Sequence, residues 1–180
     1  MNYSYKGKIL ISTPDGSGDI FSRSVVLIID HDEHGTMGFI LNKKSQSAGS
    51  LVVFGQPVQV YEGGPVEEDR IFLIVKGPKV TNEFSVINDE FYSTDDRDAV
   101  MRALATGLLS VEDIKVFAGC SSWAPMQLEG EIQRKIWTIV DVYNLDYTLP
   151  NDQNLWKNIM QNLGGEFLLW ANAPEDVSLN

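Results

Sequence analysis

The chain has 180 residues, 43% of them hydrophobic, and 25 acidic against 14 basic side chains give it a formal charge of −11. A chain of this length and composition can bury a core of its own, which excludes disorder as its main state and favours one domain over residues 1–180. Its apolar runs are far shorter than a membrane span, and residues 1–10 lack the apolar stretch of a signal peptide. A single cysteine excludes an intrachain disulfide, so we expect a cytoplasmic protein without membrane attachment.

Most of the excess acid lies in the second part of the chain. Residues 67–180 carry 19 acidic and 9 basic side chains, and lysine and arginine occur at most in pairs. Binding to a nucleic-acid duplex depends on clusters of lysine and arginine that replace counterions along the phosphates. The sequence therefore predicts that direct nucleic-acid binding is unfavourable, and so is attraction to an anionic membrane surface.

The first half of the chain has the patterns of β-strands. The run from Ser24 to Asp30 is apolar and β-branched, typical of a central strand, and a turn at 31–35 joins it to a second strand as a hairpin. Turn-forming residues at 13–19 indicate a flexible loop, and small polar residues at 42–50 indicate a mobile one. Strands are expected at residues 3–11, 24–30, 36–41, 58–61 and 71–75.

The second half changes to helical spacing. Capping and acidic residues at 93–96 precede an apolar stripe that includes Val100, Met101 and Leu108. Pro125 indicates the first turn of a second helix, and a third helix is capped at 151–152 and stopped by Gly164. Strands are expected at 113–118 and 136–142. This mixture predicts an α+β fold with a largely antiparallel sheet and about three helices.

His31 and His34, the only histidines, lie in the predicted hairpin turn. Zinc needs three or four ligands, so Cys120 or nearby carboxylates would have to complete a site. A polar turn explains both histidines without a metal, and we predict neither a metal nor a cofactor. The glycine-rich segment 15–19 likewise lacks the spacing of a phosphate-binding loop.

Cys120 offers the best argument for an enzyme. It follows a predicted strand and precedes a predicted helix, where the helix dipole can lower the pKa of a thiol, and His31 could act as its base. The alternative function is therefore a hydrolase or redox enzyme that uses Cys120 with His31. The simpler interpretation is a small buried hydrophobe, which is the more frequent role of a free cysteine.

Three ordered segments resemble the signatures of the YqgE/AlgH family of bacterial proteins, over nearly the whole chain. The first signature lies within residues 14–43 and includes Phe21-Ser22-Arg23-Ser24, His31 and Asn42-Lys43. The second is Gly63-Gly64-Pro65-Val66, followed by Asp69-Arg70. The third includes Gly119, Ser122-Trp123, Gln127-Leu128-Glu129 and Trp137.

The resemblance implies a single α+β domain with a coiled, branched sheet. Members of this family are often described as transcriptional regulators, from a genetic association with alginate control, and no general catalytic activity or cofactor attaches to them. Cys120 stands where the family commonly has tyrosine, so the resemblance implies no cysteine nucleophile. We therefore expect a cytoplasmic regulator or protein-interaction module that acts through a protein partner. The sequence leaves its oligomeric state open.

The candidate binding residues are polar, aromatic or glycine positions within the three signatures. Trp123 is expected in a strand-to-helix connection, with Gln127 and Glu131 facing outward on the next helix. If the hairpin and this connection meet, they form one shallow groove; in the simpler interpretation Trp123 packs in the core and Gln127 and Glu129 brace the helix. The candidates are His31, Asn42, Gly63, Gly64, Trp123, Gln127 and Glu129.

The segment Glu62-Gly63-Gly64-Pro65 is expected to form a sharp turn. At least one of its glycines should have a positive φ, because only glycine adopts that conformation at little cost. Replacing both glycines with alanine should then destabilise the fold.

Overall fold

The apolar run at residues 25–29 forms a strand whose two faces are both covered. The computed structural model describes residues 3–13, 20–152 and 154–173, and in it the run lies in β2 (Val25–Asp32). Leu27 and Ile29 pack toward α3 (Asn154–Leu163), whereas Val26 and Ile28 pack toward α2 (Gln127–Gln133). β1 (Ile9–Ser12) and β3 (Gly35–Ile40) flank β2, and β10 (Trp137–Val140) pairs with β1. Burial on both faces explains why this strand is apolar throughout.

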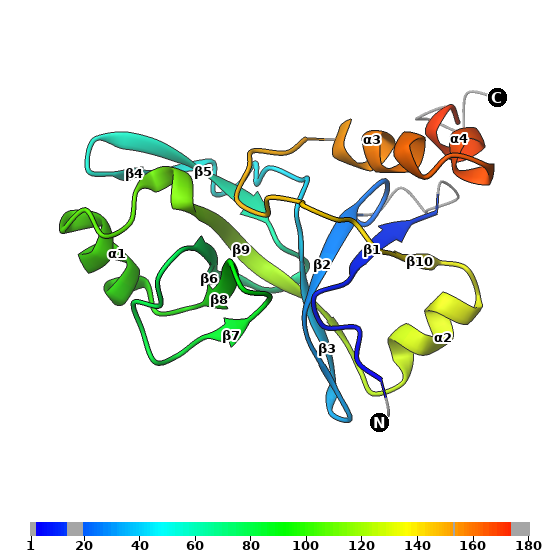
Figure 1. The fold of residues 1–180 in the computed structure, drawn as a ribbon, viewed down its shortest axis with the longest axis horizontal. Helices are drawn as coiled ribbons and strands as arrows, with labels where there is room; N and C mark the ends of the chain where they lie inside the picture. The colour runs from blue at the N-terminus through cyan, green and yellow to red at the C-terminus, as the bar shows by residue number, and fades with distance from the viewer. Residues whose placement is uncertain (1–2, 14–19, 153, 174–180) are drawn as a thin grey trace.

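Strand β9 (Ile114–Trp123) joins the two halves of the sheet. Its last residues pair with β3, whereas its first residues lie between the antiparallel β6 (Val66–Lys76) and the parallel β5 (Gln56–Glu62). β8 (Phe91–Thr94) and β7 (Ser85–Val86) continue the sheet beyond β6, and β4 (Ser50–Val53) pairs with β5 as a branch. The main order is β10-β1-β2-β3-β9-β6-β8-β7, and Figure 1 shows β9 running through both halves.

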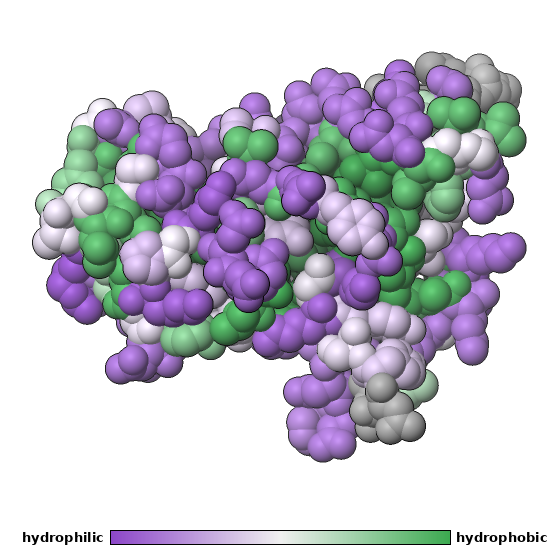
Figure 2. Space-filling model, in the orientation of Figure 1, coloured by the Kyte–Doolittle hydropathy of each residue, from purple (hydrophilic) through white to green (hydrophobic). Residues whose placement is uncertain are grey.

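Each half of the sheet has its own helices. α1 (Arg97–Ala105) packs on the half formed by β5, β6 and β9, whereas α3 and α4 (Glu166–Ala171) lie over β1 and β2. Hydrophilic side chains cover most of the face seen in Figure 2, and hydrophobic ones show beside α1 and beneath α3. The predicted α+β class and the branched, mainly antiparallel sheet are confirmed. None of the described helices is long and apolar enough to span a membrane.

Several predicted elements differ in detail. Met101 is exposed, because the face of α1 toward the sheet is formed by Ala99, Val100 and Ala103. Leu108 is also exposed and lies beyond the end of the helix. The predicted loop at 42–50 is paired at its start, where Ser45 N–H donates to the Val60 carbonyl at 2.8 Å. Four elements were not predicted from the sequence: strands β4, β7 and β8 and the fourth helix, α4. The loop prediction at residues 14–19 lies outside the described residues.

Lys115 is buried in the middle of the sheet despite its charge. Its Nζ donates to the carbonyls of Leu41 and Leu149, at 2.7 and 2.9 Å, and lies 4.1 Å from the centre of the Tyr61 ring. Burial lowers the pKa of Lys115 to about 7. These two hydrogen bonds therefore join β9 to the segment that follows β3 and to the segment that precedes α3.

The chain passes β9 at Gly63 and Gly64 with almost no space between the two backbones. A Cβ added at Gly63 would lie 2.2 Å from the Gly119 oxygen, and one added at Gly64 would lie 2.3 Å from the Cys120 carbonyl. The Gly63 carbonyl accepts the Ser121 hydroxyl at 3.0 Å. Gly64 has a φ of 157°, which confirms the expected positive φ, so both this backbone conformation and the close approach favour glycine here.

We predict that replacing Gly63 and Gly64 with alanine lowers the free energy of unfolding by roughly 3 kcal/mol or more, because the added methyl groups collide with backbone that cannot move aside. Urea unfolding measures the change. Gly130→Ala is the matched control: Gly130 lies in α2 with open space around it, so alanine there should stabilise by about 0.5–1 kcal/mol. A double variant as stable as the wild type would contradict the close-approach argument.

Candidate functional site

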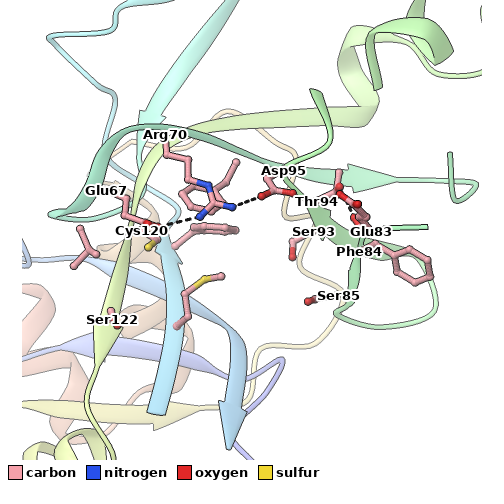
Figure 3. Close-up of a pocket in the computed structure, with 14 residues that line it drawn as sticks. Glu67, Arg70, Glu83, Phe84, Ser85, Ser93, Thr94, Asp95, Cys120 and Ser122 are labelled. Atoms are coloured by element: carbon pink, nitrogen blue, oxygen red, sulfur yellow. Dashed lines mark hydrogen bonds and ion pairs between the residues drawn. The ribbon is translucent and has the colours of Figure 1, made fainter. Parts of the chain in front are cut away.

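A cleft of about 520 Å³ opens between the two halves of the sheet (Figure 3). Alternate residues of β3 and β9 face it, because side chains on a strand alternate between its faces. β3 contributes Met37 and Phe39, and β9 contributes Cys120 and Ser122. We call this cavity the interlobe cleft. Its other lining residues come from β6, from the start of β7 with the two residues before it, and from the end of β8 with the residue after it: Val66, Glu67, Arg70, Phe72, Glu83, Phe84, Ser85, Ser93, Thr94 and Asp95.

The floor of the interlobe cleft is aromatic. Phe39 and Phe72 are buried, and their ring centres are 5.4 Å apart. At the mouth of the cleft, Val66 and Phe84 are 38% and 39% exposed. An apolar floor with partly exposed apolar side chains at its edge is the usual make-up of a binding site.

Arg70 lies over this floor because of a bulge in β6. The pairing of β6 with β9 jumps from Val66 opposite Cys120 to Ile71 opposite Ala118, and the intervening residues loop out. The guanidinium carbon of Arg70 lies 4.9 Å from the centre of the Phe72 ring. Arg70 also pairs with Asp95 and, at 3.2 Å, with Glu67. Among the described residues that line the cleft, Arg70 is the only basic one, and two carboxylates pair with it.

Cys120 lies within β9 and not near a helix start, which corrects the sequence-based placement. It is 4% exposed, and burial, with a smaller contribution from Glu67, raises the pKa of its thiol. A raised pKa keeps the sulfur protonated at neutral pH, whereas a nucleophile needs the thiolate. The environment of Cys120 therefore differs from that of an activated cysteine.

His31 is held by hydrogen bonds on both ring nitrogens. Nδ1 accepts the Tyr5 N–H at 2.8 Å and so carries no proton, which leaves Nε2 to donate to the Glu129 carboxylate at 2.8 Å. The Tyr5 ring stacks on the imidazole with ring centres 4.7 Å apart. Neither nitrogen is available as a base for Cys120. His34 is exposed beside Glu33, and the described residues hold no group of three or more potential metal ligands.

Trp123 is the last residue of β9 and is buried, so it does not lie in the strand-to-helix connection that we expected. Its Nε1 donates to Glu131 at 2.8 Å, and Gln127 Nε2 donates to the same carboxylate at 3.3 Å. The Gln127 side-chain oxygen in turn accepts the Ala124 N–H at 2.9 Å. Trp123 therefore packs in the core, and Gln127 and Glu131 brace the start of α2.

Asn42 lies at the opposite end of the hairpin from His31. Its side chain accepts the Val25 N–H at 2.9 Å and donates to the Arg23 carbonyl at 3.0 Å. Val25 and His31 are six positions apart along an extended strand, or about 20 Å. The expectation of one groove containing both His31 and Asn42 is therefore wrong.

The seven candidates fall into three places in the structure. His31, Trp123, Gln127 and Glu129 gather where β2 and β9 meet α2. Gly63 and Gly64 form the crossing at β9, and Asn42 braces the other end of the hairpin. Their role in binding stays a prediction.

Sequence analysis missed the interlobe cleft. Its lining comes from five segments of the chain, and their charged and hydroxyl side chains form no spaced motif. The available signals were Val66 and Arg70, which belong to the second matched signature, and Ser122, which belongs to the third.

Comparison with known proteins identifies the family of this chain. A model of the family described as AlgH-like matches residues 9–168, so the chain belongs to this family. A UPF0301 protein of Cytophaga hutchinsonii is 33% identical over 97% of this chain and 98% of its own. A UPF0301 protein of Parabacteroides distasonis is 34% identical over 97% of this chain and 91% of its own.

Solved structures share the fold. A protein of Corynebacterium diphtheriae has a TM-score of 0.74 at 22% identity, covering 96% of this chain and 94% of its own. The solution structure of the AlgH protein from Pseudomonas aeruginosa has a TM-score of 0.71 at 24% identity, covering 98% of both chains. Both solved structures therefore have the fold of this chain.

We predict that the rate of Cys120 alkylation in the folded protein rises only above pH ~8.5, which is the ordinary pKa of a free thiol. Burial favours the neutral form of the Cys120 thiol and so raises its pKa. The rate is measured against pH with iodoacetamide, and the urea-unfolded protein is the control. An apparent thiol pKa below ~7 in the folded protein would restore the enzyme hypothesis.

Proposed function

We propose that this AlgH-like protein is a non-catalytic cytoplasmic regulator that acts by binding a protein partner in the interlobe cleft. Any effect on transcription then passes through the partner. The observation that carries the proposal is the cleft itself, an aromatic floor with charged and hydroxyl groups at its walls. Its volume of about 520 Å³ is in the range of ligand-binding sites.

The chemistry of the cleft favours binding over catalysis. Cys120, the nucleophile of the alternative function, has a raised pKa, and His31, the base proposed for it, uses both ring nitrogens elsewhere. A nucleophilic mechanism needs a thiolate or an adjacent base, and the described residues supply neither at Cys120.

The charge of the chain favours a protein partner over DNA. The formal charge is −11, and the net charge of the cleft lining is also negative, with Glu67, Glu83 and Asp95 against Arg70. Phosphate backbones are bound mainly by lysine and arginine, so a duplex would be repelled from this surface.

We predict that Ser122→Trp abolishes the capture of partner proteins, because Ser122 is an exposed side chain inside the cleft and the indole would fill it. The tagged wild-type protein and the variant are purified from the bacterium that produces them, and the captured proteins are quantified by mass spectrometry. Ser122→Ala, which leaves the cleft open, is the matched control and should capture the same proteins as the wild type.

Two results would contradict the proposal. One is an unchanged set of captured proteins with Ser122→Trp, which would show that partners bind elsewhere. The other is micromolar binding of the wild-type protein to random duplex DNA in a gel-shift assay at ~50 mM salt, where attraction to phosphates is strongest.

A further inference from the structure

We propose that the interlobe cleft takes a segment of the partner protein that presents an arginine or lysine beside a large apolar side chain. This inference rests on the proposed function, since it names the chemistry of the partner at the same site. Three features of the cleft support it: a buried hydroxyl without a hydrogen-bond partner, an apolar floor and an excess of carboxylates.

Ser93 supplies the unpartnered hydroxyl. The residue is 6% exposed, lines the cleft from β8, and its side chain makes no hydrogen bond to the described residues. None of the described buried side chains has a polar atom that is both sealed from solvent and unpartnered, so the Ser93 oxygen is reached from the cleft. Figure 3 shows Ser93 on the cleft wall below Asp95. Buried polar groups in folded proteins are normally satisfied, so this hydroxyl is suited to a hydrogen bond from an entering segment.

The floor and the mouth define an apolar subsite. Phe39, Phe72 and Met37 lie at the base, and Val66 and Phe84 stand partly exposed at the edge. Covering an exposed aromatic ring on binding gains free energy in proportion to the apolar area removed from water. A large aliphatic or aromatic side chain fits this part of the cleft.

The carboxylates select the charge of the partner. Asp95 and Glu67 share the single Arg70, and Glu83 has no ion pair with any described residue. The cleft lining therefore carries two net negative charges. Charge complementarity favours a cation here and disfavours phosphates and acidic peptides.

Arg70 shows how such a cation can be held. Its guanidinium lies over the Phe72 ring and between two carboxylates, which combines a cation–π contact with ion pairs. The Lys79 ammonium of the same chain lies 5.8 Å from the centre of the Phe84 ring, so what remains for a cation from outside is the carboxylate of Glu83 beside that partly exposed ring.

The test uses two peptides of equal length, both acetylated and amidated, with the sequences Arg-Leu-Arg-Leu-Arg and Glu-Leu-Glu-Leu-Glu. Each is titrated into the full ¹⁵N-labelled chain, and binding is followed by amide chemical shifts. We expect the basic peptide to shift the resonances of Ser93 and Ser122 and the acidic peptide to shift neither.

Two variants separate cleft binding from general attraction to an acidic protein. Glu83→Gln should weaken binding of the basic peptide roughly two- to five-fold, whereas Glu166→Gln, the same change of charge on α4, should leave it unchanged. Ser122→Trp keeps the net charge and should weaken binding at least about ten-fold, because the cleft is filled.

Equal binding of the two peptides, or binding of the basic peptide that Ser122→Trp leaves unchanged, would overturn the inference. If neither peptide binds but Ser122→Trp still abolishes capture of native partners, the partner chemistry is wrong and the proposed function stands. If Ser122→Trp leaves native capture intact, the proposed function fails as well.

Discussion

The contact on which the rest of this structure depends is the close passage of Gly63 and Gly64 over β9 at Gly119 and Cys120. Side chains are excluded there on both sides, since a Cβ at Gly119 would also lie 2.5 Å from the Gly64 oxygen. The passage lets β9 exchange partners, with β5 beside its first residues and β3 beside its last. One strand can therefore belong to two differently covered halves of a sheet.

The cleft follows from this exchange of partners. Beyond the crossing, alternate residues of β9 face different environments: Cys120 and Ser122 face the interlobe cleft, whereas Trp123 packs toward α2. The bulge in β6 lies beside the same crossing and carries Arg70 over the aromatic floor. The fold thus places the only arginine of the cleft and its carboxylates at the junction of the two halves.

Local patterns in the sequence predict the parts of the fold that one segment decides by itself. The apolar run of β2 indicated a central strand, and the helix expected between its cap at 151–152 and Gly164 forms as α3, with Trp156, Ile159 and Met160 buried. The same logic fails for α1, where the bulky Met101 lies outward and small alanines face the sheet. The interlobe cleft and the burial of Lys115 depend on which distant strands become neighbours, and no short pattern records that.

The central claim is that β9 makes the two halves one cooperative unit with the cleft already formed between them. Native-state hydrogen exchange in low concentrations of denaturant tests it most directly, because it measures the opening free energy of each amide. The protected amides of residues 114–118 and those of residues 121–123 should exchange with the same free energy, equal to that of global unfolding. Opening free energies that differ between the two segments by about 3 kcal/mol or more would show two halves that unfold separately, and would contradict the account.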